Sequence, residues 1–274
     1  MPNRPLHNKI RFHYLYIDYI DHSVLAFLRS NKPIWDRMGT KLTLWPYKTE
    51  NNDQSIWDVF VREIWPIFAT NIRHLSFEDG DYLDNLRRRI SPTILTDLDH
   101  LNSIDSGRLL PSGIADDRPW PHAIAAQALT KWLHTPSKNG QPKRLYRNGF
   151  LGPPNPEWVD NFKEAFRRAT TSVSYTIQHY FCLEIMPTEQ FELVNGRTNE
   201  KLTLKLSKEL GYKCLYNWML RRCPIGETAT VPEIKWEDRE NSCANANLNN
   251  INFDLWSFNK SVGPLSPPAE EEKE

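Results

Sequence analysis

The sequence is poor in the features that would assign it to a class directly. Its 274 residues include four cysteines, Cys182, Cys214, Cys223 and Cys243, and none forms a Cys-x-x-Cys pair. This spacing argues against a zinc ribbon or a dithiol redox motif. Basic and acidic residues both number 34, so the formal net charge is zero. A neutral chain has no global attraction to nucleic acid or to anionic membrane.

Further absences narrow the expected location and chemistry. No apolar run reaches the roughly 20 residues that cross a bilayer, and the start, MPNRPLHNKIRF, lacks the apolar core of a signal peptide. We therefore expect reduced thiols and a cytoplasmic or nuclear protein. The GxSxG, HExxH, GxGxxG and P-loop motifs are also missing. We expect no catalytic residues, no metal site and no cofactor.

Short stretches of alternating apolar and polar residues predict β-strands along the first two thirds of the chain. They lie at 12–18, 41–47, 72–77, 101–105, 143–147 and 173–181. Helix-period stretches separate them, at 23–38, 55–71, 81–100, 123–134 and 156–171. Pro33 is expected to break the first of these helices, and Ser91-Pro92 the third. The strands recur about every 30 residues, which favours a leucine-rich-type βα solenoid or an open parallel α/β sheet.

The pattern changes after residue 182. Two alternating stretches within 189–207 flank Asn195-Gly196, a pair typical of a hairpin turn, and 212–225 supplies one or two further strands. We predict an α/β fold of irregular leucine-rich-repeat-like βα repeats, with a curved, mostly parallel sheet and a small C-terminal antiparallel sheet. The expected units are a repeat domain at 1–182, antiparallel strands packed on it at 183–240, and a disordered tail at 241–274.

Three groups of residues invite a chemical role, and each has a simpler structural explanation. Arg87–Arg89 could contact phosphate, although Asp81 and Asp84 just upstream favour a solvated helix face. Asp116-Asp117 could bind a hard cation, but no third acid is near. His134 could act as a general base, yet a helix C-terminus favours histidine through its dipole alone.

Strand alternation also predicts a surface for binding a partner. Leu42 and Leu44 point to one side of their strand, and Thr43 and Trp45 point to the other. In a βα solenoid the second face is the open side of the sheet, unless helices or the C-terminal hairpin cover it. Ser103 and Asp105 belong to this face as well. The candidate partner-binding residues on it are Tyr14, Tyr16, Thr43, Trp45, His74, Ser76, Arg144 and Tyr146.

Several segments together resemble a lineage-expanded family of F-box proteins from plant-parasitic nematodes, over roughly residues 10–240. The most specific is Lys-Trp-Leu-x-Thr-Pro…Gly…Pro-Lys at 131–143, followed by Arg-Cys-Pro-Ile at 222–225. The others are LYIDYIDHSVLAFLRS (15–30), NIRHLSF (71–77), ISPTILTDLDHLNSID (90–105) and MPTEQFELVNGRTNEKLTL (186–204).

In that family an amino-terminal F-box docks on the adaptor of a cullin-type ubiquitin ligase. The resemblance implies that the region matched here selects the protein to be ubiquitinated. No Leu-Pro helical F-box precedes it in this sequence. We therefore expect a protein-interaction module with a protein partner, not nucleic acid or membrane, and a ligase adaptor only where an F-box lies upstream. The alternative is a free-standing partner-binding or decoy protein without a ligase role.

Overall fold

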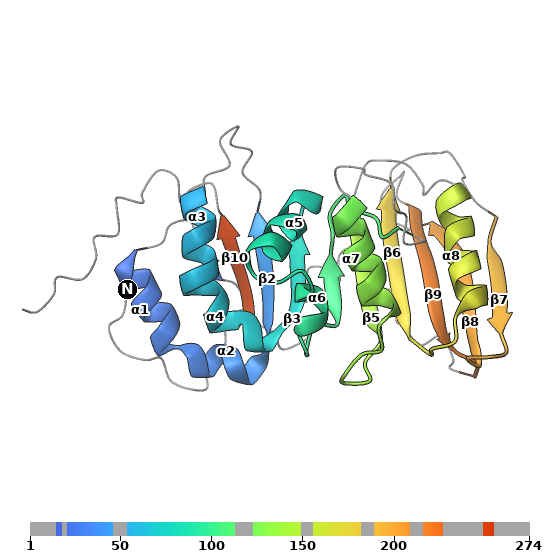
Figure 1. Ribbon diagram of the computed structural model, residues 1–274, viewed down its shortest axis with the longest axis horizontal. Helices are drawn as coiled ribbons and strands as arrows, with labels where there is room; N and C mark the ends of the chain where they lie inside the picture. Colours follow the sequence, from blue (N-terminus) through green and yellow to red (C-terminus); the bar gives the residue numbers. More distant parts are fainter. Residues whose placement is uncertain are drawn as a thin grey trace, which may run out of the picture.

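The fold is built on one mixed β-sheet with helices packed on one of its faces (Figure 1). The computed structural model describes residues 15–17, 21–45, 54–112, 123–148, 156–181, 189–208, 216–226 and 249–254. Ten strands of these residues form the sheet, in the order β1-β10-β2-β3-β4-β5-β6-β9-β8-β7. From β1 to β6 neighbouring strands run parallel, and from β6 to β7 they run antiparallel. The predicted α/β class with a mostly parallel sheet is confirmed.

The predicted strands and hairpin are all present. The parallel strands are β1 (Leu15–Ile17), β2 (Thr40–Trp45), β3 (Ile72–Phe77), β4 (Ser103–Asp105), β5 (Lys143–Asn148), β6 (Tyr175–Phe181) and β10 (Asn249–Asp254). The antiparallel strands are β7 (Phe191–Asn195), β8 (Glu200–Lys208) and β9 (Tyr216–Pro224). Because β9 pairs with β6 along the length of β6, the antiparallel strands continue the parallel sheet. The antiparallel strands predicted at the C-terminal end are present, but they extend the ten-stranded sheet and do not form a small sheet of their own.

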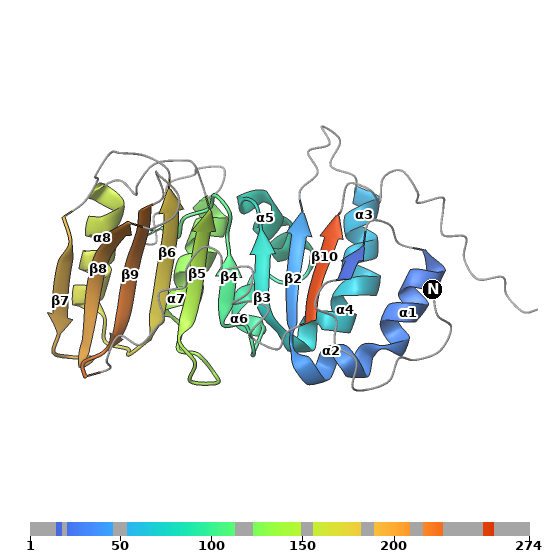
Figure 2. The same ribbon diagram turned by 180° about the vertical axis from the view of Figure 1, so that it is seen from behind.

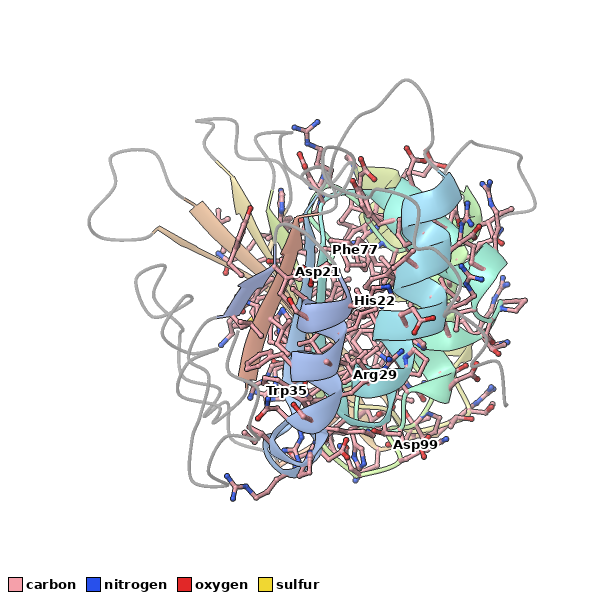
Figure 3. The ribbon with its side chains drawn as sticks, turned by 90° about the vertical axis from the view of Figure 1, so that its left-hand side faces the viewer. Asp21, His22, Arg29, Trp35, Phe77 and Asp99 are labelled. Carbon is pink, nitrogen blue, oxygen red and sulfur yellow. The ribbon has the colours of Figure 1, made fainter. Side chains whose placement is uncertain are left out.

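The helices form a single layer. They are α1 (His22–Ser30), α2 (Lys32–Met38), α3 (Gln54–Val59), α4 (Trp65–Phe68), α5 (Gly80–Arg89), α6 (Ile94–Asp97), α7 (Ala123–His134) and α8 (Pro156–Arg168). A π-helical turn, Phe60–Ile64, joins α3 to α4, and a 3₁₀ turn, Ala69–Asn71, follows α4. Figure 2 shows the sheet from behind, with the helices beyond it, and Figure 3 shows the two layers from the side of α1. None of these helices is long and apolar enough to span a membrane.

Short polar side chains set the helix boundaries. The Asp21 carboxylate accepts a hydrogen bond from the Val24 backbone N–H at 2.8 Å, so Asp21 caps α1. Asp79 caps α5 in the same way. Asn31 separates α1 from α2 just before Pro33, and α5 and α6 end and begin on either side of Ser91-Pro92, as predicted.

Strand register places one apolar row under the helices. Each member lies opposite the next across the sheet: Leu15, Ile251, Leu42, Leu75, Ile104, Leu145, Ile177, Leu220, Leu204 and Phe191. From Ile251 to Leu204 these side chains are at most 2% exposed, and only the two edge residues are half-buried. We call this row the apolar row. It fixes which side of every strand meets the helices.

The prediction of a disordered tail at 241–274 is wrong for residues 249–254. This segment is β10, which lies between β1 and β2 and pairs in parallel with both. Two neighbouring strands satisfy its backbone groups, and Ile251, fully buried, fills its place in the apolar row. The asparagine-rich composition around β10 does not favour a strand, and β10 forms because it pairs with strands that are distant in the sequence.

We expect Ile251→Ala to lower the free energy of unfolding by about 2–4 kcal/mol, since it leaves a cavity between β1 and β2. Urea unfolding followed by circular dichroism measures the change. Val194→Ala is the control, because Val194 is 64% exposed on the edge strand β7 and its truncation should cost less than about 0.5 kcal/mol. Equal effects of the two substitutions would show that β10 does not belong to the folded core.

Candidate functional site

The candidate partner-binding residues lie together on the sheet surface opposite the helices, which we call the strand face. One row across it contains Tyr16, Thr43, Ser76, Asp105 and Tyr146, and the next contains His74, Ser103 and Arg144. Tyr14 lies outside the described residues. Trp45 is the last residue of β2, but its side chain is outside the described part of the chain. The predicted common face follows directly from the register, which aligns the strands residue by residue.

These residues differ in how much surface they offer. Tyr16 is 47% exposed, Arg144 is exposed and Ser76 is half-buried, whereas Thr43, His74 and Tyr146 are buried. The rings of His74 and Tyr146 stack across β4, with centroids 6.4 Å apart and planes inclined by 23°. This stacking removes part of both rings from solvent. The exposed side chains of the set are thus Tyr16 and Arg144, toward the two ends of its rows.

The helix side of the sheet carries a buried lysine that explains the most specific sequence motif. Lys143, the first residue of β5, is 4% exposed, and its ammonium donates hydrogen bonds to the carbonyls of Trp132 and of Thr135, the latter at 2.5 Å. It also lies 5.2 Å from the centre of the Trp132 ring. Lys143 therefore satisfies the free carbonyls at the end of α7. Burial lowers the pKa of this ammonium to about 8.

His134 belongs to the same buried cluster. Its ring stacks on Tyr175 with centroids 5.6 Å apart, and its Nε2 lies 3.5 Å from the tyrosine hydroxyl. Burial, together with the positive charges of Arg222 and Lys143, lowers the pKa of His134 to about 4. At neutral pH the imidazole is uncharged and packed. His134 therefore has a packing role, and the expected attraction between a protonated histidine and the helix dipole does not apply to an uncharged ring.

A buried ion pair ties the antiparallel strands to the loop after α8. The Arg222 guanidinium donates to the Glu200 carboxylate at 2.6 and 3.1 Å, and both side chains are at most 2% exposed. Glu200 also accepts from the Val173 N–H at 2.7 Å, and Arg222 donates to the Thr171 carbonyl at 2.8 Å. Although burial alone would raise the pKa of Glu200, these hydrogen bonds and the arginine hold it below its usual value.

A second buried cation lies in β5, toward the carboxyl edge of the parallel strands, where α/β sheets commonly bind ligands. Arg147 of β5 is 5% exposed; its Nη1 lies 3.0 Å from His179 Nε2, and its Nε donates to the Arg108 carbonyl at 3.3 Å. Burial lowers the pKa of Arg147 to about 10. The segment after β4 lies close to the Glu78 backbone at Gly107, where a Cβ would stand 1.9 Å from the Glu78 carbonyl oxygen. Among the described residues, these contacts occupy the edge beside β4 and β5 with protein groups.

The remaining candidate residues either form ion pairs or lie outside the described part of the chain. No cluster of three or more metal-ligating side chains occurs among them. Arg87 pairs with Asp84, one of the two expected partners, which is buried, whereas Arg89 pairs with Asp58 of α3. A hollow of about 260 Å³ between α6 and α7 is lined by a mixture of apolar and polar side chains, including Leu95 and Ile124. Asp116 and Asp117 lie outside the described residues.

The buried polar residues Lys143, Arg147, Glu200 and Arg222 were missed by the sequence analysis. The alternation of side chains along β5 could have identified two of them, because Lys143 and Arg147 each lie two residues from the inward-facing Leu145 and so share its side of the strand. A charged residue at an inward position usually indicates a paired charge. No protein-family model, curated protein or solved structure matches this chain.

We expect Lys143→Met to lower the free energy of unfolding by about 2–3 kcal/mol, since the carbonyls at the end of α7 lose their donor. Lys131→Met is the matched control within the same motif, because Lys131 is exposed and should cost less than about 0.5 kcal/mol. Thermal and urea unfolding of both variants provide the comparison. If Lys143→Met is as harmless as the control, the ammonium does not hold the helix end.

The His134 environment predicts a pH dependence of stability. In the unfolded chain His134 takes up a proton near its ordinary pKa of 6.5, whereas in the folded protein it does so only near 4. The unfolded state therefore binds more protons in this window, and stability falls as the pH drops from about 6.5 to 4, by about 2 kcal/mol. His134→Gln should flatten urea-unfolding stability between pH 7 and 4.5 by this amount. The exposed His100→Gln should leave the slope as it is, and identical slopes for both variants would contradict the assignment.

Proposed function

We propose that this chain is a protein-interaction module that selects a protein partner on its strand face, as the recognition region of an F-box-type, cullin-based ubiquitin ligase subunit would. The observation that carries the proposal is the two-sided architecture. The helices lie on one face of the sheet, and strand register gathers the polar and aromatic candidate residues on the other (Figure 2). A wide, in-register surface suits recognition of another protein.

The repeated strand–helix units support the finer fold proposal as well. From β2 to β5 each strand is followed by helical segments on the same side and then by its parallel neighbour in the sheet. We take this as an irregular, leucine-rich-repeat-like array, in which the concave strand side receives the partner. The buried titratable groups on the helix side hold α7, α8 and the strands together, which supports binding rather than catalysis as the role of the protein.

The alternative is a free-standing binding or decoy protein without a ligase role. In this alternative the chain binds its partner on the same strand face, but it is not bound to a cullin or to a ligase adaptor. Co-purification separates the two when the chain is expressed with the coding sequence found upstream of Met1. Recovery of a cullin and its adaptor would support the ligase subunit, and a captured partner without them would support the decoy.

Both versions predict that the double variant Tyr16→Ala and Trp45→Ala captures less partner while its thermal unfolding stays within a few degrees of the parent. The change removes aromatic area from the strand face and leaves the apolar row intact. Partners are identified by cross-linking and mass spectrometry, with Ile124→Ala as control because Ile124 is 56% exposed on α7. If the control loses the same partners, or the double variant loses none, the strand face is not the recognition surface.

A further inference from the structure

The sheet ends at β7, at the opposite end of the molecule from α1 (Figure 1), and the outer side of β7 pairs with no strand of the described residues. On its other side β7 pairs with β8 in five successive residue pairs, from Phe191 with Leu204 to Asn195 with Glu200. A strand at the end of a sheet carries unpaired backbone N–H and C=O groups, and these groups match the edge of another strand. The outer side of β7 is therefore a place where a further strand can add to the sheet.

The side chains of β7 do not protect this edge. Val194 on the strand face is 64% exposed, and Glu192 beside it is exposed. Phe191 and Leu193 point toward the helices and pack on the core, but both are only half-buried. Edge strands that avoid association commonly carry a proline, a bulge or an inward-pointing charge. β7 has none of these, because its inward residues are Phe191, Leu193 and Asn195 and its register with β8 is regular.

The sequence of β7, Phe-Glu-Leu-Val-Asn, complements a second copy of itself that runs in the opposite direction. With Leu193 opposite Leu193 of the second copy, Glu192 lies opposite Val194 and Phe191 lies opposite Asn195, so all five residues pair. A shift of two residues leaves only three pairs and, in one direction, places Glu192 opposite Glu192, which is repulsive. Residues directly opposite each other point to the same side of an antiparallel pair, so both helix layers lie on one side and Leu193 continues the apolar packing across the junction.

We propose that β7 is the docking strand for a second copy of this chain, so that two sheets join edge to edge, antiparallel and centred on Leu193. The open edge requires another strand, and the complementarity of the five residues with themselves assigns that strand to β7 of the second copy. One five-residue strand makes a small contact, so the dimer is weak and depends on protein concentration. The inference is independent of what the strand face binds, and it places two strand faces side by side on one continuous sheet.

The test uses charges at position 194, with dimerisation of the full chain measured by sedimentation velocity over a wide range of protein concentration. Val194→Glu places a carboxylate opposite Glu192 of the second copy, twice in each dimer, and should weaken dimerisation about tenfold at about 0.05 M salt. Val194→Lys places an ammonium at the same positions and should keep or tighten the dimer. The difference between the two variants should shrink at about 0.5 M salt, because the ions screen both contacts.

Within one chain the same substitutions act in the opposite sense, which separates association from folding. Val194 lies opposite Lys201 of β8, so Val194→Glu gains an attraction in the monomer and Val194→Lys gains a repulsion. Weaker dimerisation of Val194→Glu therefore does not come from unfolding, and urea unfolding of both variants checks this. The matched controls are Ile124→Glu and Ile124→Lys, because Ile124 is 56% exposed on α7, which packs on α5 and α6. Each control should change dimerisation less than about twofold.

Hydrogen exchange provides a second measurement, because backbone amides of β7 that pair with a second copy should exchange more slowly as the protein concentration rises. A chain that stays monomeric at every concentration overturns the inference. So does a dimer that responds equally to Val194→Glu and Val194→Lys, or in the reverse order, or equally to the Ile124 controls. A dimer whose formation leaves the exchange of the β7 amides unchanged also overturns it, since the copies would then associate through another surface.

Discussion

The register of the ten strands is the constraint on which the rest of the molecule depends. The apolar row runs from Leu15 to Phe191 across parallel and antiparallel strands alike, and every member between the two edges is buried. Because side chains alternate from one face to the other, a slip of one residue in any strand would turn its apolar side chain to the strand face. The same register therefore defines the core under the helices and the surface opposite them.

Buried charges on the helix side reinforce that register. Lys143, Arg147 and Arg222 occupy inward positions where an aliphatic residue would pack at less cost in desolvation. Each is matched to groups that exist at one place only: the carbonyls ending α7, the His179 ring with the Arg108 carbonyl, and the Glu200 carboxylate. A shifted strand would leave a cation buried without these partners. The polar contacts thus act against alternative pairings, whatever they add to stability.

Local sequence patterns predicted the elements well and their long-range relations only in part. The alternation in IRHLSF predicted β3 with its observed bounds, and the turn at Asn195-Gly196 predicted the β7–β8 hairpin. β10 was not predicted, because a six-residue strand in an asparagine-rich segment gains its stability from pairing with β1 and β2. For the candidate site, the alternation of side chains along each strand predicted that the candidate residues share one face of the sheet. The burial of His74 and Tyr146 could not be predicted, since their stacking spans β4 and depends on register.

The two faces of the sheet also divide the charges of the protein. In the helix layer, several acids and bases pair at i, i+3 and i, i+4 spacings, whereas the exposed Arg88 and Lys131 form no ion pair with a described residue. A strand cannot do this within itself, because neighbours on one face are two residues apart and cross-strand partners come from distant sequence. Arg144 and Lys205 meet no acid in register, as Thr176 and Met219 lie beside them. Which charges pair on the strand face therefore depends on the assembled sheet and does not follow from the net charge of zero.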